Sequence, residues 1–400
     1  MLKKSSLVEP LLSQIPNLTP NLMPDSIPNL IPFTRPAIDE ATIAGVCDIL
    51  RSGQLTTGKQ NLLFESALSQ HCNGRLVRTC TSGTATLAIA CQLAGIGSGC
   101  EVITTALSWV ATSNVILLAG ATPVFVDVDS KTRNINLDQI AAAITPKTKA
   151  IMPVDLAGLP VDRNQLYDIA QSHHLRVIED AAQSFGASWH GKPIGSFGDL
   201  ISFSFHANKN ITTIEGGALV VNNQAEATLA EKYRFQGVTR SGVDEMEVDI
   251  LGSKSNLSDV AARIGLGQLN SLAAFTSKRQ QLARHYFACF QNSLALNKGL
   301  ELPLADFENC NWHMFQVVLP ASIRRSQFMQ AMHSQGIATG VHYRPIHRFA
   351  LYQHLDYRAG SLPQTERIGE SIVTLPLYPG LTQNHIQYIV ETINTFFSKI

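Results

Sequence analysis

A lysine and an aspartate, each placed just past a strand-like segment, are the side chains of this sequence best suited to chemistry. Asp180 follows an apolar run at residues 175–178, and Lys209 follows a second run at residues 201–205. Both runs are short and rich in residues that favour strands. Because small-molecule sites in open α/β sheets form at the ends of strands, we expect these two side chains to face one site.

An amine and a carboxylate in one site suit the chemistry of pyridoxal phosphate (PLP). The aldehyde of this cofactor needs a lysine amine to hold it as an imine, and its ring nitrogen needs a buried carboxylate to stay protonated. Lys209 and Asp180 fit these two roles. Taken singly, they are better explained as a surface lysine and a helix-capping aspartate, so the cofactor hypothesis depends on further motifs.

A candidate phosphate site lies at Ser82-Gly83-Thr84, which stands between a strand-like approach and a run of strong helix formers at residues 85–93. Glycine allows a ligand to approach the backbone closely, and the free N–H groups of a first helical turn attract an anion. Serine and threonine before a helix are common as caps, so this signal is weak alone. Beside the lysine and the aspartate, it predicts the cradle of the cofactor's 5′-phosphate.

Eight motifs occur in order along the chain: SGQLTTG (52–58), SGTAT (82–86), SWVAT (108–112), VIEDAAQ (177–183), SFHANKNIT (204–212), EGG (215–217), NLSD (256–259) and GVHYRPIH (340–347). In these motifs the chain resembles the DegT/DnrJ/EryC1/StrS family of sugar aminotransferases, from about residue 31 to the C-terminus. Within the family it is most similar to the UDP-4-amino-4-deoxy-L-arabinose–oxoglutarate aminotransferases. Several ordered motifs over nearly the whole chain make this resemblance specific.

The resemblance implies an α/β fold of the aspartate-aminotransferase type (PLP fold type I), with a large domain on a mostly parallel sheet and a smaller α/β C-terminal domain. The alternation of strand-like and helix-like segments over residues 75–225 predicts the same helix-covered parallel sheet. We expect a Pro/Asn/Leu-rich N-terminal arm (1–31), a large PLP-binding domain (32–275) and a small domain (276–400). At the junction we expect two consecutive helices, the second of which begins the small domain.

The first of these two helices is expected at residues 257–272 and the second at residues 276–294. The prolines of the N-terminal arm forbid a continuous helix, so an extended arm is expected there. It would be a flexible leader, a strap over the body or a segment that packs across a subunit interface.

The resemblance also implies cofactor contacts. Trp109 is expected to stack on the pyridine ring and press it toward Asp180, although a core tryptophan is the alternative from the local sequence. Gln183 belongs to the expected cofactor-binding set, and Ser204 would add a hydroxyl to the phosphate site. Asn256 would reach the phosphate of the neighbouring subunit's cofactor, so that the sites are shared in an obligatory homodimer.

Three further residues are expected near the substrate. Thr57 lies in a segment that in the family runs close to the bound sugar, although the sequence alone shows a polar turn. The resemblance places His342 and Arg344 near the mouth of the active site. No metal site is expected at the histidines of HYRPIH, because Pro345 and their spacing exclude a helical pair and no acidic ligand stands beside them.

Four positions depart from the family pattern. Asp155 stands where the family usually carries histidine, and Gln236 where histidine is frequent. Ser253 and Ser255 stand where tyrosines are frequent, so the loop that contains them lacks aromatic contacts. These departures bear on the contacts to the substrate and on how the loop before Asn256 is ordered.

Composition excludes several classes of protein. The 400 residues allow two lobes and a large core, and 31 basic against 31 acidic side chains give a net charge of zero. Nothing therefore indicates a nucleic-acid partner or a charged membrane surface. No apolar run approaches the roughly 20 residues of a membrane helix. Seven scattered cysteines without CxxC spacing indicate reduced thiols and a cytoplasmic location.

The expected reaction is a transamination with PLP as cofactor and ping-pong kinetics. Glutamate would give its amino group and leave as 2-oxoglutarate, and a nucleotide-linked keto-sugar would accept the group. Lys209 would move the proton, and Asp180 would keep the ring protonated. The amino sugar would serve a cell-surface polysaccharide, lipid A or a secondary metabolite.

Three alternatives remain. Some members of the family are dehydratases that carry histidine in place of the lysine, and Lys209 argues against them. An aminotransferase for a cyclitol or another keto substrate would share the same motifs. A PLP-binding sensor or scaffold without catalysis is the third, and the intact set of Asp180, Gln183 and Lys209 argues against it.

Overall fold

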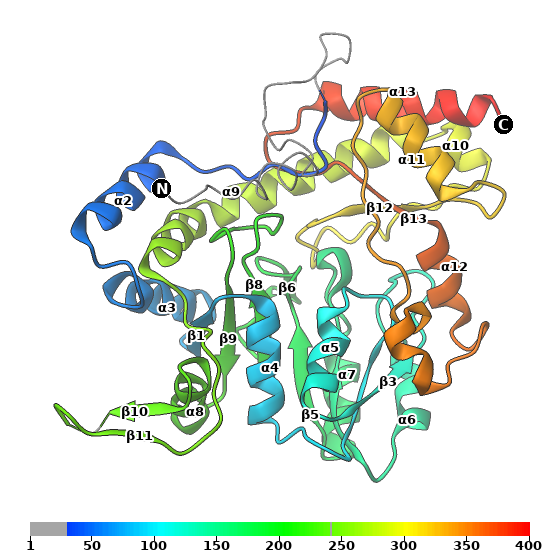
Figure 1. Cartoon of the computed structure of the whole chain (residues 1–400). Helices are drawn as coiled ribbons and strands as arrows, with labels where there is room; N and C mark the ends of the chain where they lie inside the picture. Colours follow the sequence, from blue (N-terminus) through cyan, green and yellow to red (C-terminus); the bar gives the residue numbers. More distant parts are fainter. Residues whose placement is uncertain (1–29, 241) are drawn as a thin grey trace, which may run out of the picture.

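The structure is a computed structural model that describes residues 30–240 and 242–400. The predicted N-terminal arm (1–31) therefore lies almost wholly outside the described residues. Figure 1 shows a sheet-centred body below and a layer of helices above, with the long helix α9 (Asp259–Phe290) running along both. Among the described residues, no helix combines the length and the apolar character that a membrane crossing needs.

A seven-stranded sheet forms the centre of the large lobe, in the order β1-β9-β8-β5-β4-β2-β3. The strands are β1 (Leu76–Cys80), β2 (Glu101–Thr105), β3 (Thr122–Val126), β4 (Thr148–Met152), β5 (Arg176–Asp180), β8 (Leu200–Ser204) and β9 (Gly217–Val221). In this sheet β9 runs against its neighbours β1 and β8, and the pairs between β8, β5, β4, β2 and β3 are parallel. The expected α/β fold with a mostly parallel sheet is confirmed.

Helices cover both faces of this sheet, so its central strands β5, β8 and β9 are buried on both sides. One face packs against α4 (Gly83–Leu93), α5 (Ala111–Leu118) and α8 (Gln224–Arg234). The other packs against α3 (Lys59–His71), α6 (Ile140–Ala143), α7 (Arg163–Ser172) and the first half of α9. In β9, Leu219 and Val221 join the first face and Ala218 and Val220 the second, as the two-residue period of a strand requires.

Helix α9 is continuous over 32 residues, so the prediction of two helices at 257–272 and 276–294 is wrong. The intervening residues 273–275 read Ala-Ala-Phe and contain no helix breaker. The helix begins where the Ser258 hydroxyl accepts a hydrogen bond from the Ala261 N–H at 3.2 Å. The predicted domain boundary at 275/276 falls inside α9, and the division into domains stays a prediction.

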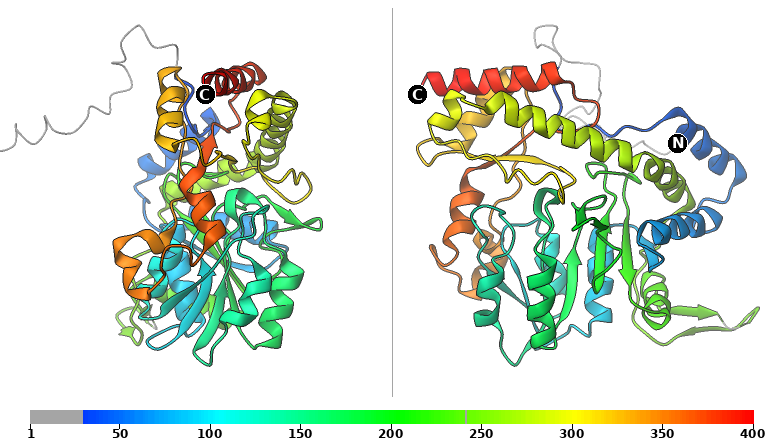
Figure 2. Two further views of the ribbon diagram at one scale, coloured as in Figure 1. Left: turned by 90° about the vertical axis from the view of Figure 1, so that its right-hand side faces the viewer. Right: turned by 180° about the vertical axis from the view of Figure 1, so that it is seen from behind.

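The small lobe packs around the second half of α9. Its strands β12 (Phe315–Val318) and β13 (Ile372–Leu375) pair antiparallel. Figure 2 shows α11 (Arg325–Ser334) and α13 (Gln383–Ser398) beside α9 above the sheet of the large lobe. The remaining elements include α2 (Glu40–Ser52), α10 (Leu294–Asn297), α12 (Pro363–Ser371), and the hairpins β6–β7 (Ser188–Trp189, Lys192–Pro193) and β10–β11 (Val238–Arg240, Met246–Val248). All seven cysteines are free thiols.

Candidate active site

A cavity of about 470 Å³ opens where β5 and β8 end, against residues 341–343 of the C-terminal part of the chain. This volume is typical of a small-molecule site. The predicted residues on its wall are Ser82, Gly83, Thr84, Trp109, Asp180, Gln183, Ser204, Lys209 and His342. The structure therefore brings together most of the residues that the sequence singled out, from segments up to 260 positions apart (342 − 82).

Lys209 stands on the loop after β8, where its backbone N–H donates to the carbonyl of His206 at 2.9 Å. Its enclosure lowers the pKa of the amine from 10.5 to about 8, against the opposing attraction of the Asp180 carboxylate. An amine with this pKa is partly neutral near neutral pH, and the neutral form is the one that attacks a carbonyl carbon. Lys209 is therefore suited to form an imine.

Asp180 ends β5 and is buried, with 6% of its surface exposed. Its Oδ2 accepts a hydrogen bond from the Thr112 hydroxyl at 2.6 Å, and its Oδ1 accepts one from the Ala182 N–H at 3.3 Å. Burial raises the pKa of this carboxyl, while the Thr112 bond and the positive charge of Lys209 oppose the rise. A buried carboxylate held in this way is suited to receive a cation from the cavity.

Trp109 is not a core residue, because 60% of its surface is exposed. It lies on the cavity wall just before α5, with its ring centre 6.0 Å from that of Tyr343. The alternative interpretation of Trp109 as a core residue is therefore wrong. An exposed indole face on a cavity wall can stack on a flat ring, and such stacking on the cofactor stays a prediction.

The turn at Ser82-Gly83 forms the start of α4, where the Ser82 hydroxyl accepts a hydrogen bond from the Ala85 N–H at 3.1 Å. Two glycines allow close packing around this turn. A Cβ on Gly83 would lie 2.8 Å from the Cβ of Ser204, and one on Gly217 would lie 2.6 Å from the carbonyl carbon of Ser82. The first turn of α4 and the Ser204 hydroxyl thus form a narrow polar end of the cavity that suits an anion.

Thr112 and Tyr343 are among the cavity residues that had not been singled out from the sequence. Thr112, in the first turn of α5, orients Asp180 across 68 positions of sequence, and no sequence pattern indicated this contact. Tyr343 accepts a hydrogen bond from the Gln183 amide at 3.1 Å, and burial raises the pKa of its hydroxyl. The neighbouring His342 is enclosed, which lowers its pKa to about 4 and keeps it neutral at physiological pH.

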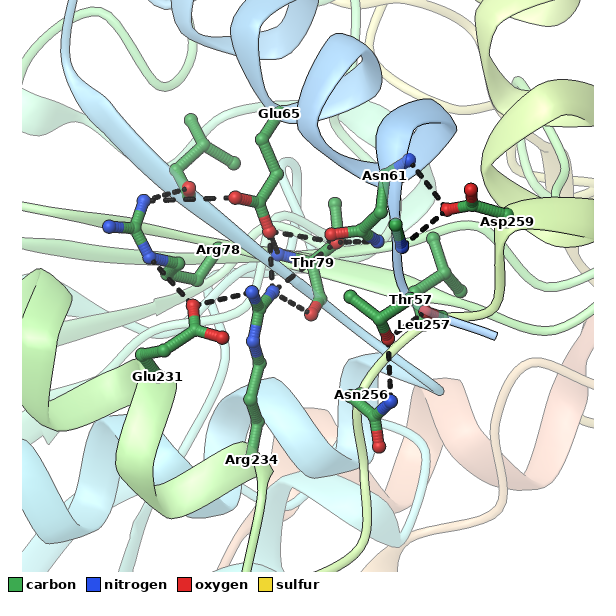
Figure 3. A network of polar contacts seen from close by, with 12 residues as sticks. Thr57, Asn61, Glu65, Arg78, Thr79, Glu231, Arg234, Asn256, Leu257 and Asp259 are labelled. Atoms are coloured by element: carbon green, nitrogen blue, oxygen red, sulfur yellow. Dashed lines mark hydrogen bonds and ion pairs between the residues drawn. The ribbon is translucent and has the colours of Figure 1, made fainter. Parts of the chain in front are cut away.

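Thr57 and Asn256 are not on the wall of this cavity. The Asn256 amide donates to the Thr57 hydroxyl at 2.5 Å, and that hydroxyl donates to the Leu257 carbonyl at 2.7 Å (Figure 3). The Asp259 carboxylate fixes the turn that holds them, since it accepts hydrogen bonds from the N–H groups of Gly58, Gln60 and Asn61 at 2.8, 3.1 and 3.0 Å. Their expected roles stay predictions.

Arg344 also lies off the cavity wall. Its side chain is exposed, with the guanidinium carbon 5.2 Å from the centre of the Phe349 ring. A contact of Arg344 with the substrate stays a prediction. Among the described residues, no group of three or more His, Cys, Asp and Glu side chains is arranged to hold a metal ion.

A sequence model of the DegT/DnrJ/EryC1/StrS aminotransferase family matches residues 36–394. The chain belongs to this family. It is 35% identical over 378 residues to the uncharacterized protein MJ1066 of Methanocaldococcus jannaschii. The matched region covers 91% of this chain and 97% of that protein.

Two solved structures superimpose closely on this chain. Streptococcus pneumoniae Spr1654, to which a sugar aminotransferase activity is ascribed, gives a TM-score of 0.87 at 30% identity and covers 92% of this chain and 98% of its own. Helicobacter pylori PseC, an aminotransferase involved in the biosynthesis of pseudoaminic acid, gives 0.86 at 28% identity and covers 93% and 100%. Spr1654 has been solved in PLP and PMP forms.

As a member of the DegT/DnrJ/EryC1/StrS family, the protein is a PLP-dependent aminotransferase with pyridoxal 5′-phosphate as its cofactor. The cavity fits this group. Lys209 offers an amine for the aldehyde, Asp180 a buried carboxylate for the ring nitrogen, and the first turn of α4 a set of N–H groups for the phosphate.

Asp155, where the family usually has histidine, is buried in an ionic cluster and is not on the cavity wall. Its Oδ2 lies 2.7 Å from Nη2 of Arg163, and the same nitrogen lies 2.8 Å from Oε2 of Glu179. The Ser184 hydroxyl donates to the same Asp155 oxygen at 2.6 Å. The departure is therefore explained by a buried arginine next to β5, which needs carboxylate partners.

The loop with the other departures is ordered by hydrogen bonds. The Gln236 N–H donates to the Ser253 carbonyl at 2.9 Å, and the hydroxyls of Ser253 and Ser255 lie 3.0 Å apart. The Ser255 N–H donates to the Arg234 carbonyl at 2.8 Å. Backbone hydrogen bonds thus hold the loop against the end of α8, and the Lys254 amine adds a contact with the Phe235 ring at 4.4 Å.

Proposed function

We propose that the protein transfers the amino group of glutamate to the keto group of a nucleotide-linked sugar. The observation that carries the proposal is that Lys209 and Asp180 line one cavity together with an exposed tryptophan and the first turn of α4. Each of these features is common alone, but their combination matches what transamination on PLP requires.

Bound pyridoxal 5′-phosphate supplies an aldehyde and an electron-withdrawing ring. We assign Asp180 to the ring nitrogen, where its negative charge keeps the ring protonated, while Thr112 and the Ala182 N–H hold the carboxylate still. Ser82, Gly83, Thr84 and Ser204 hold the phosphate, Trp109 covers one face of the ring, and Gln183 completes the cofactor set.

Lys209 has two tasks in this proposal. It would bind the aldehyde in the resting enzyme, and its free amine would move a proton from the α-carbon of the amino donor to the cofactor. In the second half-reaction it delivers a proton to the carbon of the former keto group. Its pKa of about 8 suits both directions, because a base near the working pH can accept and return a proton.

A sugar acceptor is supported by the relatives and by the form of the cavity. PseC is described as an aminotransferase of pseudoaminic acid biosynthesis, and Spr1654 is ascribed a sugar aminotransferase activity. Beyond the cofactor-binding end, His206, Glu215 and His342 also line the cavity and offer hydrogen bonds to hydroxyl groups. We propose that Thr57 and Arg344 contact the nucleotide-sugar as well. The product would be an amino sugar, in the cytoplasm, for polysaccharide, lipopolysaccharide or secondary metabolite synthesis.

We further propose a homodimer with shared sites. Asn256 and Thr57 bond to each other away from the cavity of their own chain, next to a second hollow lined by Ile214, Leu257 and Ile264. Mixing two inactive variants tests this arrangement. Asn256→Ala and Lys209→Ala subunits should together restore activity in mixed dimers, because one of the two sites then has both residues intact, and failure to restore it despite exchange of subunits contradicts the sharing.

Borohydride reduction of the PLP-loaded enzyme, followed by peptide mapping, tests the central assignment. Label on Lys209 is expected, and label on another lysine would sink the proposal. Lys209→Ala should lose both the imine absorbance and turnover with its fold intact, whereas the exposed control Lys147→Ala should keep both. Asp180→Asn should retain the cofactor but lose most turnover.

The acceptor class requires a separate screen. Glutamate should first convert the bound cofactor, seen as a shift of its absorbance, and no shift with any amino acid would favour a sensor or scaffold. Nucleotide-linked 4-keto-sugars, beginning with the UDP-linked 4-keto pentose, should then reverse the shift. A reversal by keto-cyclitols alone would replace the sugar assignment.

A further inference from the structure

A buried segment of the small lobe, Asn311-Trp312-His313, contacts the large lobe directly behind the cavity. The three residues expose 0%, 1% and 4% of their surfaces. Trp312 has a φ of 55°, a left-handed conformation that is unusual for a bulky residue and that persists only where the surroundings enforce it. Its ring packs on Phe307 in the small-lobe core, with ring centres 4.8 Å apart. The flanking side chains bond to the large lobe instead.

Asn311 holds the turn that follows Asp180. Its amide donates to the carbonyls of Gln183 and Phe185, both at 2.9 Å. The approach is close enough to require a glycine, since a Cβ on Gly158 would lie 1.8 Å from the Asn311 amide oxygen. Gly158 also has a φ of 89°, so this position requires glycine both for space and for its backbone conformation.

His313 holds the loop that carries Lys209. Its Nδ1 lies 3.0 Å from Oδ1 of Asn210, the residue next to the lysine. The Asn210 amide nitrogen donates to the Phe185 carbonyl at 3.3 Å, which directs the amide oxygen toward the imidazole. His313 must therefore donate through Nδ1–H, and its Nε2 has no hydrogen-bond partner in the described part of the chain.

The imidazole is neutral. Burial lowers the pKa of His313 well below 6.5, and the positive charges of Lys209 and Arg279 and the nearby His342 lower it further. A neutral ring has a single N–H, and the bond to Asn210 uses it. His313 thus acts as a fixed donor to the lysine loop.

We propose that Asn311 and His313 are positioning residues for the reaction: Asn311 fixes the turn after Asp180, and His313, through Asn210, fixes the loop that carries Lys209. The inference rests on the proposed roles of Asp180 and Lys209. The two catalytic groups come from different strands, and one rigid turn of the small lobe sets the distance between them. Geometry matters here, because a misplacement of about 1 Å can cost on the order of 100-fold in rate.

Two amide substitutions at the histidine separate positioning from packing. Asparagine carries its amide nitrogen at the distance of Nδ1 from the backbone, so His313→Asn can keep the bond to Asn210. Glutamine carries it at the distance of Nε2, so His313→Gln cannot. Tyr286→Phe is the matched control, because it removes another buried small-lobe hydrogen bond, from the Tyr286 hydroxyl to the Pro376 carbonyl at 2.8 Å, that involves neither Asn210 nor Lys209.

The measurements are the rate of imine formation when PLP is added to apoenzyme, the kcat and KM of the glutamate half-reaction, and the Tm. His313→Gln should slow imine formation and kcat at least tenfold with KM changed less than threefold. His313→Asn should stay within threefold of the wild type in both rates. Tyr286→Phe should lower the Tm as much as His313→Gln does and leave the rates unchanged.

Equal rates in the two amide variants, or wild-type rates in His313→Gln, overturn the inference. Should His313→Gln fail to fold, Asn210→Ala tests the same bond from the other side and must show the same loss in imine formation. Borohydride mapping of the wild type separates a failure of the proposed function from a failure of the positioning role. Label away from Lys209 defeats the proposed function, whereas label on Lys209 with equal amide variants defeats only the positioning role.

Discussion

The enclosed amine of Lys209 should make the stability of the apoenzyme depend on pH in a direction that its chemistry fixes. The native pKa of about 8 lies below the usual 10.5, chiefly because enclosure disfavours the charged form. At about 1.4 kcal/mol for each pKa unit, this difference corresponds to about 3 kcal/mol. We take that figure as an upper limit, because the side chain is partly exposed to the cavity and water there screens the charge.

The sign follows from proton counting. Below pH 8 both the native and the unfolded chain hold the lysine proton, so the full cost of enclosing the charge is present. Between about pH 8 and pH 10.5 the native state has released the proton while the unfolded chain still holds it. The unfolded state then binds more protons, and the free energy of unfolding must rise with pH over this window.

Urea denaturation of apoenzyme at several pH values measures the effect, with Lys209→Met as the reference. The difference in unfolding free energy between wild type and Lys209→Met cancels the titration of all other groups that the two share. It should grow by up to about 3 kcal/mol in favour of the wild type from pH 8 to pH 10.5. The exposed control Lys147→Met should follow the wild type. A flat difference would show that the native amine is not perturbed.

Three further substitutions test the framework of the site. Arg163→Met should lower the unfolding free energy by about 3–5 kcal/mol in urea, because two buried carboxylates lose their cation; a loss below 1 kcal/mol would contradict this. Asp259→Ala should cost about 1–2 kcal/mol and loosen the turn at Thr57, measured by hydrogen exchange of that turn. Gly217→Ala should weaken PLP binding about tenfold by titration, since the added Cβ strains the Ser82 turn. Gly97→Ala, where the Cβ meets no atom within 4 Å, should bind PLP normally.

The sequence was most informative where a site residue follows directly from a strand or begins a helix. Asp180 and Lys209 could be placed because each comes just after a short apolar run, and the ends of such strands meet at one side of a sheet. Ser82 could be placed because a cap and a glycine mark the start of a helix. Trp109 had two explanations until its exposure excluded the core.

Contacts between segments distant in the chain could not be predicted in this way. The bond from Thr112 to Asp180 spans 68 positions and that from Asn210 to His313 spans 103, and neither leaves a periodic pattern in the sequence. The expected division of α9 into two helices is also wrong, because residues 273–275 favour a helix and nothing in them ends one. The expected role of Asn256 involves a second subunit, which a single chain does not contain.

The charges around Asp180 suggest why this member of the family carries aspartate at position 155. Arg163 is one buried cation between two carboxylates, Asp155 and Glu179, so the cluster next to β5 has an excess negative charge. Burial raises the pKa of Asp180 first, and the negative charge of Asp155 raises it further. Both effects are relieved when a cation occupies the cavity beside Asp180. In the proposed arrangement the cluster would therefore favour a protonated ring nitrogen beside Asp180, and Asp155 would act from outside the cavity wall.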